Sequence, residues 1–562
     1  LKPSGYSALA GDATFANGMV AALQKSVSGW NFNQFGVSSS NSSAVNSSFF
    51  NNAINRAGQS CIVGDGGFYS ISTTLIFGNN YSGIRSLNSL IQLYMNASNT
   101  THVKFSSATP ELGDRITFCE MEGVRMMRNS SLANTDSTCA EFNNIRNCNF
   151  SKLVIEGSHC ALKVNGSEFS NFSNLDISSF QTGMTDNPAR STIEYDGFPL
   201  TAGGKSSSYT TNFINFNIRG AQSGHVLNIG QADGLNFSNG YFGKSILPMI
   251  NIENVTDSSV ISEVKFNNVY VDGVNQTTGA PTALHIPTVV GTGRVIAEIQ
   301  FNNCNMNNFT SDAVIINGKA SVTMNGTKIA NGRGWGINHT STEGNFIFTG
   351  GSGISNVNND GGKGIATFGA LNTVNISDSI FKFTTGGLTL TDTLVATLSS
   401  NQFFNVTTEI TQTGVGRYRA VTNQSNLSAL TDSYGIVTFT PTLTIGGSST
   451  GITYESQVAY AQKIGGFVNY SILVNLTNKG AEVGNVIIGS LPFTANAEAS
   501  GAISCQSLAA GVGDSHLQST VLSNGVSLIP SKIISNGTKQ TLTNADIKNA
   551  SKFSLTGVYY SA

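Results

Sequence analysis

Two carboxylate residues stand at comparable places in this 562-residue chain and could perform acid–base chemistry. Glu156 lies six residues after Phe150, and Asp176 lies four residues after Phe172, within two stretches of similar sequence. If the two phenylalanines align on neighbouring strands, ordinary strand spacings place the two backbone positions roughly 8 Å apart. That separation suits a general acid and a general base on opposite sides of a glycosidic bond, which need about 6.5–9.5 Å for inversion. The alternative is that both are solvated surface carboxylates.

A second carboxylate pair comes from a repeat further along the chain. Glu263 and Glu298 lie three residues before Phe266 and Phe301, so stacking of the two copies would place them on neighbouring strands. Two carboxylates at that spacing repel each other, which raises one pKa and suits an acid beside a nucleophile. The alternative is that Lys265 or another neighbour neutralises them.

Three histidines leave a different reaction open. In a lyase, a His, Lys or Tyr removes the proton beside a uronic acid carboxylate. His159, His225 and His285 could do so, but their spacing singles out none of them, and a lone histidine in a strand is more often structural. No metal-ligand cluster or phosphate-binding loop is present, so the sequence predicts neither a metal nor another cofactor.

Rings and hydrogen-bonding groups accompany these carboxylates on the outward positions of the same stretches. They would stack on sugars and bind their hydroxyl groups. The longest insertion, residues 179–211, could form the wall of a cleft with Asp186, Arg190, Glu194, Tyr195 and Asp196. The predicted substrate-binding residues are Arg125, Asn217, Arg219, Tyr241, Tyr270, Asp272 and Asn305.

A repeated stretch predicts the strands that position these residues. ISEVKFNNVYVDG (residues 261–273) returns as IAEIQFNNCNMN (residues 296–307), and looser copies extend along much of the chain. The apolar anchors recur mostly every 22 to 29 residues, a period typical of stacked repeats. An asparagine two residues after the anchor could bond from turn to turn and tolerates a left-handed corner. These are Asn174, Asn215, Asn239, Asn268 and Asn303.

The composition favours a β-rich array and excludes some functions. Charged residues make up only 11% of the chain, while 61 Gly and 33 Phe favour strands and turns over helices. A net charge of -2 offers no basic surface for nucleic acid. No apolar run is long enough to insert into a membrane. Seven scattered cysteines predict buried free thiols in a protein that folds in a reducing compartment.

The pattern divides the chain into three parts. Residues 1–37 read as an N-terminal neck, and residues 38–425 as a parallel β-helix. A helix capped by Ser47 or Ser48 and ended by Gly58 would close the first turn of this coil. Residues 426–562 alternate like an antiparallel β-sandwich for trimerisation or carbohydrate binding. Because the chain begins at Leu1 and not Met, we expect an upstream part to be missing.

Two stretches resemble a known family. Phe35-Gly36-Val37, a short helix ending in Ala57-Gly58, and a strand leading to Gly66-Gly67-Phe68-Tyr69 resemble the start of the right-handed parallel β-helix of phage tailspikes and pectate-lyase-like proteins. The acidic stretch that usually follows the first turn is replaced by Ser38-Ser39-Ser40-Asn41. Residues 453–493 resemble the C-terminal β-sandwich domains of phage tail appendages.

The resemblance implies a homotrimeric spike on a virion tail, folded in the host cytoplasm. Such spikes bind and depolymerise a bacterial surface polysaccharide, either capsule or O-antigen, and the carboxylate pairs favour endo-glycoside hydrolysis. A polysaccharide lyase is one alternative. A non-catalytic receptor-binding fibre or adhesin is the other.

Overall fold

The computed structural model describes residues 30–561 with short internal gaps, and two short strands before them, β1 (Ala13–Thr14) and β2 (Val20–Ala21). The gaps are 132–135, 180–183, 202–204, 206–207, 221–222, 253–259, 274–281, 289–294, 297, 342–343, 358–363, 369–372, 392–394, 414–416, 422, 426–435, 465–466, 510–511 and 513–515. Contacts divide the chain into two compact units. The first extends to residue 427, and the second is Ser428–Ala562 with two short pieces from residues 398–424.

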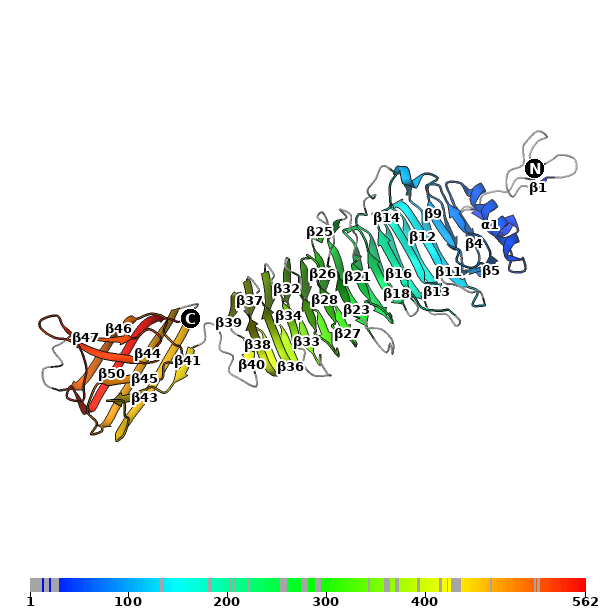
Figure 1. Ribbon diagram of the computed structural model, residues 1–562. Coiled ribbons are helices and arrows are strands. Elements are labelled where there is room, and N and C mark those ends of the chain that lie inside the picture. The colour runs from blue at the N-terminus through cyan, green and yellow to red at the C-terminus, as the bar shows by residue number, and fades with distance from the viewer. Residues whose placement is uncertain are drawn as a thin grey trace. The chain divides into compact units, whose positions relative to one another are not determined.

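The first unit is a parallel β-helix, as the repeat predicts (Figure 1). In its central turns a long strand with a bend alternates with a second strand. The long strands are β11 (Glu120–Arg128), β13 (Asn149–Glu156), β15 (Asn171–Ser178), β17 (Asn212–Arg219), β20 (Asn236–Gly243) and β23 (Val264–Asp272). The second strands are β12 (Thr138–Arg146), β14 (Cys160–Glu168), β16 (Asn187–Asp196), β18 (Ser223–Ile229), β21 (Ile250–Ile252) and β24 (Leu284–Ile286).

Further strands complete the coil on both sides. Before the central turns are β3 (Trp30–Asn31), β4 (Cys61–Gly64), β5 (Gly67–Ile71), β6 (Leu75–Phe77), β7 (Gly83–Ser86), β8 (Ile91–Met95), β9 (Val103–Ser106) and β10 (Ile116–Thr117). A small sheet holds β19 (Ala232–Asp233), β22 (Val260–Ser262) and β25 (Val295–Ile296). After them are β26 (Ile299–Asn302), β27 (Asn305–Asn307), β28 (Val314–Ile316), β29 (Val322–Asn325), β30 (Lys328–Ala330), β31 (Ile337–His339), β32 (Asn345–Thr349), β33 (Gly353–Ser355), β34 (Gly364–Phe368), β35 (Thr373–Ser377), β36 (Ile380–Thr391), β37 (Val395–Ser399), β38 (Gln402–Thr413), β39 (Arg417–Val421) and β40 (Gln424–Ser425).

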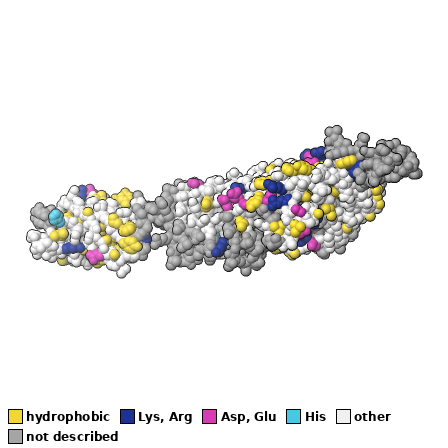
Figure 2. Space-filling model, turned by 90° about the horizontal axis from the view of Figure 1, so that it is seen from above, with side chains coloured by type: hydrophobic (Ala, Val, Ile, Leu, Met, Phe, Trp, Pro, Cys, Tyr) yellow, Lys and Arg dark blue, Asp and Glu magenta, His cyan; other side chains and the backbone are white. Residues whose placement is uncertain are grey.

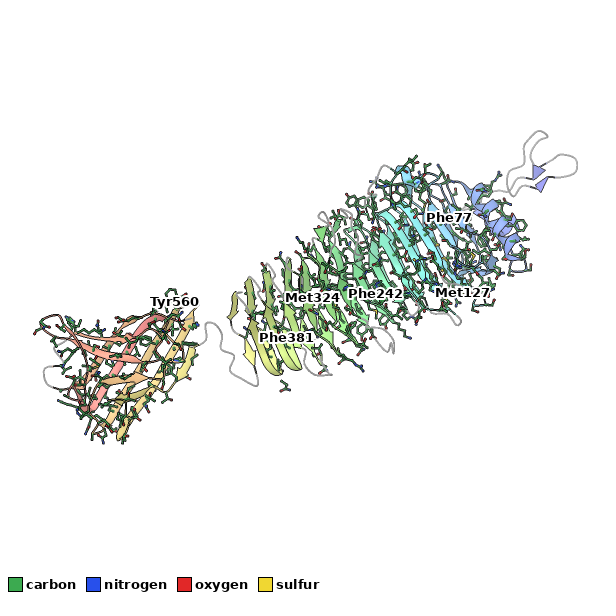
Figure 3. The ribbon with its side chains drawn as sticks, in the orientation of Figure 1. Phe77, Met127, Phe242, Met324, Phe381 and Tyr560 are labelled. Atoms are coloured by element: carbon green, nitrogen blue, oxygen red, sulfur yellow. The ribbon has the colours of Figure 1, made fainter. Side chains whose placement is uncertain are left out.

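The predicted register of the anchors is confirmed. Phe150 pairs with Phe172, and Phe266 pairs with Phe301, so the two copies of the repeat stack turn on turn. Their rings form a column inside the coil; the centroids of Phe172 and Phe213 are 4.7 Å apart and their planes differ by 7°. Figure 3 shows Phe242, Met324 and Phe381 along this interior, and all three are fully buried. Each such burial stabilises the fold by about 1.5–3 kcal/mol.

The predicted asparagines turn the long strands β15, β17, β20 and β23. Asn174, Asn215 and Asn268 have φ values of 55°, 54° and 56°, in the left-handed region that asparagine tolerates. The Asn268 Nδ2 donates to Oδ1 of Asn239, 3.0 Å away on the previous turn. Glycines take the same place on other turns, at Gly123, Gly326 and Gly350.

A helix closes the N-terminal end of the coil, but it starts earlier than predicted. Helix α1 (Ser43–Ala57) follows Ser42, and Ser47 lies inside it, where its Oγ accepts from the Ser72 backbone N–H at 2.8 Å. The prediction was wrong because the polar first turn is held by Asn46, whose side chain bonds to Ser38. Phe50 packs on Phe32 and Tyr69 beneath the helix. Two 3₁₀ turns, η1 (Phe32–Phe35) and η2 (Pro110–Leu112), complete the helical structure of the described residues.

The second unit is antiparallel. Its strands are β41 (Ile436–Phe439), β42 (Thr442–Ile445), β43 (Ile452–Ile464), β44 (Phe467–Lys479), β45 (Val486–Gly489), β46 (Ala499–Leu508), β47 (His516–Val521), β48 (Leu528–Ile533), β49 (Lys539–Thr541) and β50 (Ile547–Tyr560). They form one continuous curled sheet. The sheet encloses its own core, which includes Val468, Ile472 and Leu555.

Free thiols and the lack of a membrane-spanning helix complete the description. All seven cysteines are free, and five of them are buried, as the sequence predicts. None of the helices in the part of the chain that the structure describes has the length and hydropathy to cross a bilayer.

Candidate functional site

The predicted binding residues lie on the outward surface of the long strands, after the bend. One row contains Arg125, Asp176, Asn217, Tyr241, Tyr270 and Asn305, one residue on each turn except the turn that holds Val154. A second row, two residues further along, contains Glu156, Arg219 and Asp272. We call these two rows the outer strip. The structure brings these nine residues together along successive turns.

The first predicted carboxylate pair lies on the outer strip with the expected offset. Glu156 pairs with Ser178, so Asp176 is two residues earlier on the neighbouring turn, a backbone separation of roughly 8 Å. Arg125 Nη2 is 2.7 Å from Glu156 Oε2. Asn217 donates to Asp176 at 3.0 Å. The two carboxylate side chains are 41% and 55% exposed, so both are readily reached by solvent.

Two tyrosines on the outer strip present parallel rings. The centroids of Tyr241 and Tyr270 are 5.8 Å apart, with 13° between the planes. The Tyr241 hydroxyl lies over Gly243, where a Cβ would be only 2.2 Å from it. Burial and the neighbouring Asp272 carboxylate raise the pKa of Tyr241. Asn307 holds the other ring by a 3.2 Å hydrogen bond to the Tyr270 hydroxyl, so the pair is a fixed platform.

The second predicted pair lies elsewhere, at the start of the repeated strands. Glu263 and Glu298 precede the paired residues Val264 and Ile299, so they lie on neighbouring turns. Lys265 Nζ is 3.7 Å from Glu263, and Gln300 donates to Glu298. Each carboxylate therefore has its own partner, and the long strands carry this pair before the bend, apart from the outer strip.

A hollow of about 680 Å³ opens over the second strands β12, β14, β16 and β18. Residues 197–199, which follow β16, line part of it. The residues around it are Asp136, Glu141, Lys163, Asn165, Ala189, Arg190, Ser191, Glu194, Tyr195, Asp196, Gly197, Phe198, Pro199 and Asn228. We call this hollow the pocket.

The floor of the pocket is a row of charged and amide side chains in register. Glu141 pairs with Lys163, Lys163 with Glu194, and Glu194 with Asn228. A parallel row two residues on contains Asn165 and Asp196, which pair with each other. Because inward side chains alternate with outward ones, every residue of these two rows faces the pocket.

Ion pairs fix the pocket carboxylates. Arg190 Nε is 2.8 Å from Glu194 Oε1, and the same guanidinium also contacts Asp136. Lys205 Nζ is 2.7 Å from Asp196 Oδ2 and 3.0 Å from its Oδ1.

Glu141 is held on one side only. Its Oε1 accepts from the Asn143 amide at 2.7 Å and lies 3.3 Å from Lys104 Nζ. Its Oε2 has no hydrogen-bond partner or ion pair among the described residues.

The sequence identified only part of this pocket. Arg190, Glu194, Tyr195 and Asp196 of the long insertion line it, and the Tyr195 ring is buried in the coil, whereas Asp186 does not line it. Glu141 and Lys163 were missed. The signal was available in TCAEFNN, CALKVNG and STIEYDG, where a charged residue recurs at one place before a turn.

The three candidate histidines of the sequence each bond to groups of the coil itself. His159 is buried, with Nε2 2.9 Å from the Thr185 carbonyl and Nδ1 3.2 Å from Ser137 Oγ. His225 Nδ1 bonds the Pro248 carbonyl, and His285 Nδ1 bonds Asn251. Burial lowers the pKa of all three, and none lines the pocket. Within the described ranges no cluster of three His, Cys, Asp or Glu could hold a metal.

Charged side chains are sparse on the coil. On the face that Figure 2 shows, acidic and basic side chains lie next to each other in small groups among uncharged side chains and backbone. A surface of this kind has no broad field of one sign, so local contacts must decide what it binds.

Comparison with known proteins gives matches among solved structures alone. No family model and no curated protein matches this chain. The Dettilon tailspike protein is 12% identical, with a TM-score of 0.46 over 94% of this chain and 93% of that one. PfbA, a surface adhesin of Streptococcus pneumoniae, is 12% identical with a TM-score of 0.44, over 68% and 94% of the two chains. The catalytic unit of a GH87 α-1,3-glucanase from Streptomyces thermodiastaticus is 11% identical with a TM-score of 0.40, over 72% and 70%.

Proposed function

We propose that this protein binds a polysaccharide along the outer strip and hydrolyses a glycosidic bond in the pocket. The observation that carries the proposal is the pocket itself, a hollow of about 680 Å³ lined by four carboxylates. Sites for small ligands usually measure about 300–1,000 Å³, so a few sugar units would fit. A hollow also removes water from the reacting bond, which the exposed carboxylates of the outer strip do not achieve.

The contacts of each carboxylate indicate its role. The guanidinium of Arg190 holds the Glu194 carboxylate in one orientation, which suits a general base for water. Glu141 has a free Oε2 that can carry a proton to the leaving oxygen, which suits the general acid. The two residues lie two turns apart, about 9.6 Å at the backbone, near the upper end of the inverting range. Lys205 holds the Asp196 carboxylate, which would stabilise the positive charge of the transition state.

The outer strip supplies binding. The parallel rings of Tyr241 and Tyr270 offer an apolar platform, and Asn217, Arg219 and Asp272 offer donors and acceptors beside it. The resemblance of the sequence to phage tailspikes extends the proposal to a homotrimeric virion tail protein whose substrate is a bacterial capsule or O-antigen.

Product analysis tests this function. The protein is incubated with purified bacterial capsular and O-antigen polysaccharides, and new reducing ends and unsaturated uronates are measured. We expect shorter chains with new reducing ends and no unsaturated sugar. Glu141→Gln and Glu194→Gln should each lower kcat by about 10²–10⁴-fold, the usual contribution of a general acid or base.

Matched variants locate the reaction. Glu122→Gln removes a surface carboxylate that pairs with Lys152 and should leave kcat unchanged. Glu156→Gln and Asp176→Asn should mainly raise KM. Loss of kcat in these two with full activity in the pocket variants would move the reaction to the outer strip. Unsaturated products would indicate a lyase, and bound but intact polymer an adhesin.

A further inference from the structure

Among the described residues, one cation that lines the pocket has no partner. Lys104 pairs with Glu141, Arg190 with Asp136 and Glu194, and Lys205 with Asp196. Lys163, in the middle of the floor, forms no hydrogen bond or ion pair with any residue in the described part of the chain. It is half-buried and points into the pocket.

The register explains why this ammonium is left available. Lys163 lies between Glu141 and Glu194, one turn or about 4.8 Å from each. Both carboxylates are already held, the first by Lys104 and Asn143 and the second by Arg190. The neighbouring Asn165 amide is also fixed, because it donates to Asn143 at 2.9 Å. The floor therefore presents one unpaired positive charge between two carboxylates that are held by other groups.

We infer that Lys163 binds a carboxylate of the sugar unit that occupies the pocket, so that the substrate is an acidic polysaccharide. This rests on the proposed function, because the sugar must enter the pocket. An ammonium–carboxylate contact in a partly closed site is a charge-assisted hydrogen bond, stronger than a neutral one. It would hold the acidic sugar between the proposed acid Glu141 and the proposed base Glu194.

A structural role is the competing explanation. Four carboxylates, Asp136, Glu141, Glu194 and Asp196, face three paired cations, and Lys163 could simply balance the fourth charge. In that case loss of Lys163 would lower Tm and would weaken binding of acidic and neutral polymers alike. Binding to a ligand carboxylate would instead change the affinity for acidic polymers alone.

Binding to a polymer and to its carboxyl-reduced form separates these explanations. The probes are the purified bacterial polysaccharides, acidic and neutral, and the same acidic polymers after conversion of carboxylates to alcohols. For the wild type we expect carboxyl reduction to weaken binding about tenfold or more. Lys163→Gln should bind the acidic polymer as weakly as the reduced one, whereas Lys163→Arg should keep most of the difference. Tm should stay within a few degrees of wild type.

Three results would overturn the inference. Cleavage of a neutral polymer by the wild type would refute the acidic substrate while leaving hydrolysis intact. Equal binding of native and reduced polymer, or a Lys163→Gln variant that still distinguishes them, would refute the contact. Binding of an acidic polymer without cleavage would refute hydrolysis and leave the role of Lys163 supported.

Discussion

At the scale of single residues, the carboxylates differ in how they are held. Arg125 and Glu156 pair on an open surface, where such a contact contributes only about 0–1 kcal/mol. The Glu194 carboxylate accepts hydrogen bonds from two guanidinium nitrogens of Arg190 and from the Ser191 backbone N–H, in a partly closed hollow. Its orientation is thus set by several contacts at once, which is the condition that a reacting carboxylate must meet.

A buried histidine predicts a pH dependence of stability. His339 lies in the coil near the rings of Phe346 and Phe368, and burial lowers its pKa to about 4. Unfolding restores a pKa near 6.5, so the unfolded chain binds more protons between these values. The contribution of His339 to the free energy of unfolding is therefore fully present above about pH 6.5. It falls by roughly 3 kcal/mol in all as the pH drops toward 4.

Replacement of this histidine tests the effect. His339→Leu replaces the imidazole with an apolar side chain of similar size and so removes the titrating group. Urea midpoints measured at pH 4.5, 5.5 and 7.5 should fall less steeply with acid for the variant than for the wild type. His102, whose pKa burial lowers to about 3, is unchanged and keeps part of the slope. Identical slopes would show that His339 is protonated in the folded coil.

At the scale of the strand, the left-handed bend is the sensitive position. Asn268 has a φ of 56° and bonds to Asn239 on the neighbouring turn. Alanine in this conformation costs about 1–2 kcal/mol. Glycine adopts it freely, as Gly326 and Gly350 already do on later turns.

The expected order of stability is therefore wild type, then Asn268→Gly, then Asn268→Ala. This reverses the usual preference for alanine over glycine inside a strand. Thermal unfolding followed by circular dichroism checks the order. An alanine variant as stable as the glycine variant would mean that the bend relaxes when the asparagine is lost.

The same strands show what a sequence can predict. Phe150 and Phe172 each begin a stretch of one pattern, so their register follows from their spacing, and the place of Glu156 and Asp176 follows with it. The bend at Asn268 could be predicted because few residues adopt a left-handed conformation. These features repeat on every turn and depend on local sequence.

The pocket could not be predicted in the same way. Glu141, Lys163 and Glu194 lie on second strands, outside the anchored stretches of the repeat, and Glu194 lies within the predicted insertion of residues 179–211. Whether these three side chains lie in register depends on the lengths of the segments that connect the strands. The start of α1 was missed for a similar reason, because the contact of Asn46 with Ser38 joins residues that no period links.

At the scale of the whole molecule, the chain has two cores. Val468, Ile472 and Leu555 belong to a buried cluster formed wholly within residues 443–559. We expect a fragment of residues 436–562 to fold alone and to melt cooperatively. Calorimetry of the fragment should reproduce one transition of the full chain. A fragment that binds dye for exposed apolar surface and melts without a transition would show that this unit needs the coil.

The in-register stacking of the coil also fixes the distances between side chains along the coil axis. Each turn advances about 4.8 Å, so the pocket floor from Glu141 to Asn228 covers three steps. Tyr241 follows one step beyond the turn of Asn228, and Tyr270 one step further. The rings lie on the long strands and the proposed catalytic carboxylates on the second strands, and their separation along the coil axis is counted in whole turns. The number of turns between them would then set the length of the shortest product, and inserting or deleting one turn would change that length by a fixed increment.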